Sequence, residues 1–198
     1  MKKNSEQSGY TLLESLAFIC IITMVAISII SVISHMLDRY KISRVTSQVV
    51  ELQKSINNRF ASAENYKKLT AKLLKDENLA PGDINWKGNA MYHKFNGSVT
   101  VGSNYTSNIT GPSSAEQGSS YYIQFSGLPQ KACIDLATQN WAHDQYSSLV
   151  TMIVNSKWCY WRVYQGAAYK NYIMPLSNAQ ASALCNSKDT NTIKWVFQ

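Results

Sequence analysis

The feature that most constrains the fold is an apolar run at residues 16–33 that contains no charged side chain. As an α-helix rising ~1.5 Å per residue, these eighteen residues would reach about 27 Å, close to the ~30 Å hydrocarbon core of a bilayer. A domain that folds entirely in water has no use for such a helix. We therefore expect residues 10–34 to include a membrane-spanning segment.

Apolar residues continue beyond this run at helical spacing. They recur every three or four positions and would form one face of a helix: Ile42, Val45, Val49, Leu52, Ile56 and Phe60. Neither glycine nor proline occurs between Tyr10 and Ala80. The pattern predicts one continuous helix to Phe60, in which the membrane anchor becomes an amphipathic core element.

The composition agrees with a protein that buries surface outside its own core. Only 16% of residues are charged, against about 25% in an average soluble chain. The net charge of +7 is compatible with a nucleic-acid partner. However, several lysines alternate with acidic residues at helical spacing, which favours a solvated helix face. These residues are Lys67, Lys68, Lys72 and Lys75 beside Glu64, Asp76 and Glu77.

The remaining residues predict one mixed domain of α+β class. Apolar spacing indicates a second helix at residues 65–79, and alternation indicates strands at residues 98–101 and 121–125. A Ser/Asn/Gly-rich loop is expected between these strands, at residues 102–120. Two further short helices are expected at residues 132–141 and 178–184.

Four cysteines are divided between the two parts of the chain. Cys20 lies in the apolar helix, whereas Cys133, Cys159 and Cys185 lie in the rest. One disulfide is the simplest expectation, and the spacing alone leaves its two partners open. Cys159 either forms the bridge or is a buried thiol, and we favour burial beside Trp158 and Trp161.

Catalytic chemistry is not indicated. The three histidines, His35, His93 and His143, lack the spacing of metal ligands, so neither a metal nor a cofactor is expected. Asp135, His143 and Asp144 near Ser147 and Ser148 could imitate a hydrolase triad, but no nucleophile motif accompanies them.

A run of aromatic and basic residues near the C-terminus could stack nucleic-acid bases. We favour core packing and strand alternation over DNA binding, because they explain the same residues more simply. The residues are Trp158, Tyr160, Trp161, Tyr164, Tyr169 and Tyr172, with Lys157, Arg162 and Lys170.

A small residue and a carboxylate mark the start of the apolar helix. In a secretory signal the small residue of the cleavage site follows the apolar run, whereas Gly9 precedes it, so cutting there would retain the helix. Glu14 is the last charge before Asp38. A carboxylate at a membrane edge is costly and marks a functional site unless it merely snorkels to water. The amine of Tyr10, freed by cleavage, is the natural partner for Glu14.

The sequence Gly9-Tyr10-Thr11-Leu12-Leu13-Glu14 resembles the processing site of type IV prepilins. The resemblance implies that a prepilin peptidase cuts after Gly9, that Tyr10 becomes the N-methylated amino terminus, and that Glu14 acts in assembly. Tyr10 in place of phenylalanine, and a helix without glycine or proline, favour the b-type. Residues 128–133, 179–185 and 193–197 also resemble the thin-pilus and enterotoxigenic type IVb pilins.

This resemblance implies an α+β pilin: a long N-terminal helix packed on an antiparallel sheet, with a C-terminal region tied by a Cys133–Cys185 disulfide. Residues 1–9 would be a leader, 10–34 the membrane and polymerisation segment, and 35–198 the globular domain. The implied product is a structural, non-enzymatic pilus subunit that forms a helical homopolymer. Implied partners are the peptidase, the assembly platform of the inner membrane and minor pilins.

The resemblance also places the leader in the cytoplasm, the unassembled subunit in the inner membrane and the assembled pilus outside the cell. Charge does not decide this orientation, because Lys2 and Lys3 precede the apolar run while Arg39, Lys41 and Arg44 follow it. Three alternatives remain: a minor pilin, a pseudopilin of a type II secretion system, and a membrane-tethered enzyme or binding module that does not polymerise.

Overall fold

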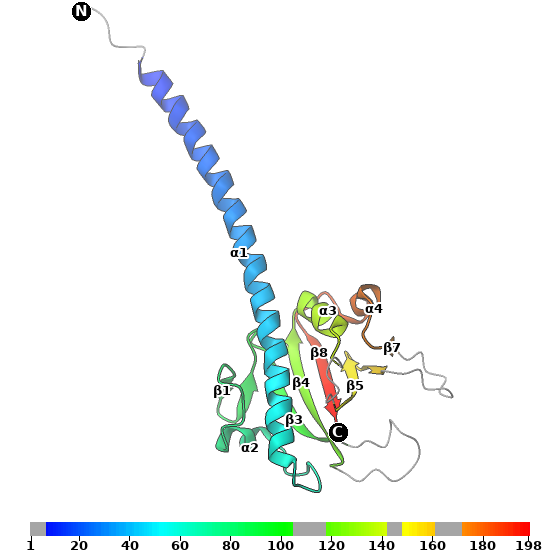
Figure 1. Ribbon diagram of the computed structural model, residues 1–198. Helices are drawn as coiled ribbons and strands as arrows, with labels where there is room; N and C mark the ends of the chain where they lie inside the picture. The colour runs from blue at the N-terminus through cyan, green and yellow to red at the C-terminus, as the bar shows by residue number, and fades with distance from the viewer. Residues whose placement is uncertain (1–6, 105–117, 142–147, 161–171) are drawn as a thin grey trace, which may run out of the picture. The chain divides into compact units, whose positions relative to one another are not determined.

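The computed structural model describes residues 7–104, 118–141, 148–160 and 172–198 (Figure 1). The chain divides into two compact units, Met1–Tyr40 and Lys41–Gln198. Helix α1, Gln7–Phe60, contributes to both units and is 54 residues long. The continuous helix predicted from the apolar spacing is therefore confirmed.

Among the described residues of the first unit, α1 is the one secondary-structure element. Every described side chain from Thr11 to Leu37 is exposed. The helix is long and apolar enough to cross a membrane, with a mean hydropathy of 2.9 over its most apolar eighteen-residue window. By length and composition this segment is compatible with membrane anchoring.

The second unit is built around an eight-stranded sheet with the order β1-β2-β3-β4-β8-β5-β6-β7. Neighbouring strands are antiparallel except for β6 and β7, which run parallel. The strands are β1 Asn85–Lys87, β2 Ala90–Tyr92, β3 Ser98–Asn104, β4 Ser120–Leu128, β5 Leu149–Val154, β6 Lys157–Tyr160, β7 Tyr172–Ile173 and β8 Asn191–Phe197. The short helices are α2 Ala71–Asp76, α3 Gln130–Thr138 and α4 Asn178–Leu184.

The core lies between the C-terminal half of α1 and one face of this sheet, as Figure 1 shows for strands β3, β4 and β8. The six apolar residues that define the predicted helix face are all at most 7% exposed. From the sheet, alternate residues of β4 point toward them: Tyr121, Ile123 and Phe125 are fully buried. Phe125 contacts Trp195 edge to face, with ring centroids 5.8 Å apart. The α+β fold is thus confirmed.

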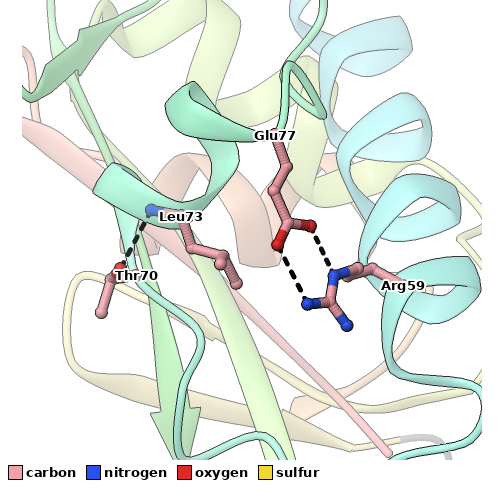
Figure 2. Close-up of polar contacts among 4 residues, drawn as sticks. All are labelled: Arg59, Thr70, Leu73 and Glu77. Atoms are coloured by element: carbon pink, nitrogen blue, oxygen red, sulfur yellow. Dashed lines mark hydrogen bonds and ion pairs between the residues drawn. The ribbon is translucent and has the colours of Figure 1, made fainter.

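The second helix differs from its prediction. It occupies only Ala71–Asp76 rather than residues 65–79. The helix starts after Thr70, which is its N-cap: the hydroxyl of Thr70 accepts a hydrogen bond from the amide of Leu73 at 3.1 Å (Figure 2). Residues before Thr70 form turns, in which Asn65 accepts a bond from the amide of Lys67. Local capping therefore overrides the apolar spacing on which the prediction rested.

The other predicted elements are reproduced with shifted ends. Helix α3 begins two residues earlier than predicted and ends at Thr138, while α4 has the predicted limits. Both predicted strands are longer than expected, and β3 extends into the start of the predicted loop. Most of that loop lies outside the described residues.

Candidate functional site

The candidate functional site is the exposed apolar half of α1. Large apolar side chains cover this half on all sides, including Leu12, Phe18 and Ile27, which are 70%, 65% and 69% exposed. A monomer in water rarely leaves a contiguous apolar surface of this kind uncovered. Among the described residues of this unit nothing covers it, which is compatible with burial in a membrane or against other subunits.

The hydroxyl groups in this half do not make it polar. Ser15, Thr23, Ser28 and Ser34 each donate a hydrogen bond to a backbone carbonyl three or four residues earlier, at 2.8 to 3.0 Å. Their donors are satisfied inside the helix, as an apolar environment requires. The surface offered to lipid or to a neighbouring helix is therefore apolar despite these residues.

Glu14 is the exception on this surface. Its side chain is exposed, and no hydrogen bond or ion pair to it exists among the described residues. Gly9 and Tyr10 lie in the first turns of α1, which begins at Gln7. The backbone thus places Tyr10 one helical turn before Glu14, while the leader residues 1–6 lie outside the described residues.

Polar contacts hold the other half of α1 on its domain. Asp83 forms an ion pair with Arg44, in which Oδ2 lies 2.9 Å from Nη2, and the same oxygen lies 3.9 Å from the ammonium of Lys94. Burial alone would raise the pKa of Asp83, but Gln48, Arg44 and the charge of Lys94 outweigh burial and lower it. Both polar atoms of the Gln48 side chain are buried and make no hydrogen bond of good geometry with other described residues.

A second ion pair lies near the end of α1. Arg59 forms a two-pronged contact with Glu77, shown in Figure 2, in which its Nη2 donates to Oε1 at 2.9 Å. Glu77 follows α2, so the pair connects the end of α1 to the segment after α2. Because both side chains are exposed, the pair contributes little to stability.

The C-terminal region is tied by a disulfide between Cys133 on α3 and Cys185, the residue that caps α4. Both are buried, with Cα atoms 5.9 Å apart and a sequence separation of 52 residues. A crosslink closing a loop of this length restricts the unfolded chain and contributes about 4 kcal/mol. The expected disulfide-tied region is present.

The two remaining cysteines differ in environment. Cys159 is fully buried, and burial raises the pKa of its thiol to about 12. Since the thiolate is the reactive form, this cysteine is inert, as predicted for a buried thiol. Cys20 is exposed on the apolar half of α1.

Two polar features of the domain escaped sequence reasoning. His93 is buried, and its Nε2 lies 3.0 Å from the carbonyl of Ser126 while Gly97 packs against both. A Cβ on Gly97 would lie 1.9 Å from that carbonyl, so only glycine fits. Asn191 is also buried and donates to the carbonyls of Leu128 and Lys188. For His93, the sequence signal was the Asn-Gly pair at residues 96–97, which indicates a tight turn next to it.

The described residues give no structural support to the catalytic interpretations. Among the described residues, no group of three or more His, Cys, Asp or Glu side chains could hold a metal ion. His143, Asp144 and Ser147 of the imitation triad lie outside the described residues. Of the interpretation of the C-terminal aromatics as core packing and strand alternation, the alternation is confirmed in β6, where Trp158 and Tyr160 are partly buried on either side of the fully buried Cys159. Tyr172 packs against the core, whereas Trp161, Tyr164 and Tyr169 lie outside the described residues.

Comparison with known proteins agrees with this architecture. A family model described as PilS N terminal matches residues 39–198. Among solved structures, the chain is similar to a type IVb pilin from Salmonella typhi, with a TM-score of 0.51 and 15% identity over 79% of this chain and 96% of that chain. A comparison with curated proteins found no match.

The long helix, the largely antiparallel sheet and the disulfide-tied C-terminal region define a type IVb pilin fold. The family match covers most of the sequence, so the chain belongs to the PilS family of pilins. Membership implies a structural role in a pilus outside the cell rather than an enzymatic one.

Proposed function

We propose that the protein is the subunit of a type IVb pilus and polymerises through the N-terminal half of α1. The observation that carries this proposal is the uncovered apolar surface of residues 11–37, which contains one carboxylate, Glu14. A lipid anchor needs the apolar surface but not the carboxylate. A bundle of α1 helices from many subunits uses both.

Maturation would begin with cleavage after Gly9 by a prepilin peptidase on the cytoplasmic side of the inner membrane. Because α1 begins at Gln7, this cut removes only the first residues of the helix and leaves Tyr10 at its amino terminus. N-methylation of Tyr10 would follow. The mature subunit would remain in the membrane as a single-pass protein until assembly.

Assembly would pair Glu14 of an incoming subunit with the amine of Tyr10 on its neighbour. Within one helix the carboxylate lacks a described partner, and an unpaired charge is costly in a water-excluding bundle. Pairing across subunits removes this cost and fixes the axial register. Since the contact joins two different surfaces and does not close, it generates an open helical fibre.

The proposal is tested by amino-terminal sequencing of filaments sheared from cells that express the chain with its peptidase and assembly platform. We expect the mature chain to begin at Tyr10 with a methylated amine. Filaments whose subunits retain Gly9 or begin elsewhere would contradict the proposed processing.

Abundance separates the main alternatives. A major subunit should account for nearly all protein in purified pili, whereas a minor pilin that accompanies it should be scarce. A pseudopilin should leave surface fibres intact when its gene is deleted and should instead stop the secretion of enzymes. A membrane-tethered binding module should retain its activity when Glu14 is replaced by alanine.

A further inference from the structure

The face of the sheet opposite α1 contains a groove of about 580 Å³. Four of its lining residues form a row across β4, β8, β5 and β6, because Gln124 pairs with Lys194, Lys194 with Ile153, and Ile153 with Trp158. Their side chains share one face: Gln124, Lys194 and Ile153 each lie between two buried residues of their strands, and Trp158 precedes the buried Cys159. The groove thus combines an amide, an ammonium, an aliphatic and an aromatic side chain.

The aromatic end of the groove is formed by Trp158, whose ring is stacked with that of Tyr160. The rings of Trp158 and Tyr160 are nearly parallel, with 10° between their planes and 6.1 Å between their centroids. Trp158 is only partly buried and lines the groove. A partly exposed indole next to polar groups is suited to a ligand that has both an apolar face and hydroxyl groups.

The cation of the groove is Lys194, and no carboxylate among the described residues pairs with it. Its ammonium lies 4.1 Å from the ring centre of Tyr122. Burial lowers the pKa of Lys194, which means that its charged form is partly desolvated. A carboxylate delivered by a ligand would form a charge-assisted hydrogen bond in this setting.

Polar side chains at the other end are held in place. Asn155 accepts a hydrogen bond from the amide of Thr192 at 2.8 Å and donates to the carbonyl of Leu184 at 2.8 Å. Asn186 accepts from the amide of Lys188 at 3.2 Å, and Gln124 donates to the hydroxyl of Ser126. Within the described residues, Nδ2 of Asn186 and Oε1 of Gln124 have no further partners and remain for a ligand.

We propose that this groove binds an acidic saccharide, with Trp158 packed against the C–H face of a sugar ring and Lys194 paired with a sugar carboxylate. Amide groups such as those of Asn186 and Gln124 would bond to sugar hydroxyls. The volume lies within the usual range of small-ligand sites. An acidic peptide is the rival ligand, because it could also pair a carboxylate with Lys194, but its side chains would not supply the several hydroxyl groups that the amides of the lining suit.

The role on a pilus rests on the proposed function. If the α1 helices form the filament core, the face that carries the groove points away from that core, because α1 packs on the opposite face of the same sheet. Each subunit would then present one saccharide site at the surface of the fibre, and many weak sites along one fibre would act together.

The test is calorimetric titration of the full chain in detergent micelles and, separately, of sheared filaments. The acidic probes are 3′-sialyllactose and tetragalacturonate, lactose is the neutral counterpart, and a glutamate-rich peptide tests the rival ligand. We expect both protein forms to bind at least one acidic saccharide and to bind lactose at least about tenfold more weakly, a tenfold change corresponding to one ion-pair contact.

Matched variants assign the site. Lys194→Gln should weaken acidic-saccharide binding at least about tenfold and bring it to the level of lactose. Lys157→Gln removes the same charge from the opposite face of β6 and should leave binding unchanged. Trp158→Ala and the milder Gln124→Ala should both weaken binding, with melting curves to verify folding.

Several outcomes would overturn the proposal: no binding of either acidic probe, tighter binding of the peptide, or equal effects of Lys194→Gln and Lys157→Gln. Binding by the micellar chain that is lost in filaments would overturn the outward placement. The micellar titration does not require polymerisation, so its result is independent of whether the chain is a pilus subunit.

Discussion

The two halves of α1 have the same backbone and opposite environments. From Thr11 to Leu37 every described side chain is exposed, whereas from Ile42 to Phe60 one face is almost completely buried against the sheet. The first half is apolar on all sides, and the second is apolar on one side only. One half of the helix therefore packs into the domain, while the other presents the apolar surface through which we propose that subunits assemble.

The largest effect is expected from Glu14→Ala. Loss of the carboxylate should abolish filaments, because it removes the proposed pairing with Tyr10 of a neighbour, while the amount of subunit in the membrane should stay unchanged. Electron microscopy and the yield of sheared pili measure this. Glu51→Ala, which removes an exposed carboxylate from the other half of α1, is the control and should assemble normally.

The next effect concerns the domain alone. The double variant Cys133→Ser and Cys185→Ser should lower the free energy of unfolding by about 4 kcal/mol, because the unfolded chain regains the entropy of a 52-residue loop. Denaturant titration followed by tryptophan fluorescence of the full chain in micelles measures this. Helicity of the apolar half should persist after the domain unfolds, and simultaneous loss of both would refute the separation of the halves.

A pair of leucine substitutions sharpens the comparison. Leu52→Ala leaves a cavity in the core and should cost about 3 kcal/mol of domain stability, since Leu52 is 0% exposed. Leu16→Ala, at a residue that is 62% exposed, should change domain stability by less than about 0.5 kcal/mol yet reduce filament yield. The same denaturant titration and pilus yield measure both. Equal stability losses would mean that the two halves are not distinct.

The smallest effect is a pH dependence of domain stability that arises from Asp83, the partner of Arg44 on α1. The pKa of Asp83 is lower in the folded state than its usual value of about 4, so its pairing stabilises the fold fully above pH ~4. That contribution disappears as the pH falls through the lower, folded pKa. Asp83→Asn should lower the free energy of unfolding by about 1 kcal/mol at pH 7 and should make stability depend less on pH below about pH 4.

Glu77→Gln is the matched control for Asp83→Asn, because Glu77 also pairs with an arginine of α1. Its partner, Arg59, lies near the end of the helix, and this pair is exposed. Its unfolding midpoint at pH 7 should equal that of the unsubstituted chain within error. A larger effect for Glu77 than for Asp83 would show that burial does not decide the strength of these pairs. Thermal melts between pH 2.5 and 7 compare the two variants.

Much of the fold follows from local patterns. The spacing of Ile42, Val49 and Phe60 specifies which face of α1 is buried, and alternation at Tyr121 and Phe125 identifies a core strand. The predicted start of α2 is wrong because Thr70 accepts a hydrogen bond from the amide of Leu73, which the apolar period does not reveal. For the site, the sequence identified Glu14 but could not say what surrounds it.

By itself, the sequence determined that one unbroken helix would be apolar on all sides in its first half and on one side in its second, because helical periodicity is a property of neighbouring residues. Cysteine spacing left the disulfide open, and the structure confirms the Cys133–Cys185 pairing that the resemblance implied. Only the tertiary structure decided that Gly97 packs on His93 and that Trp158 faces away from the core with Lys194. These pairings join residues distant in the chain, and they depend on strand order and register, which local spacing does not encode.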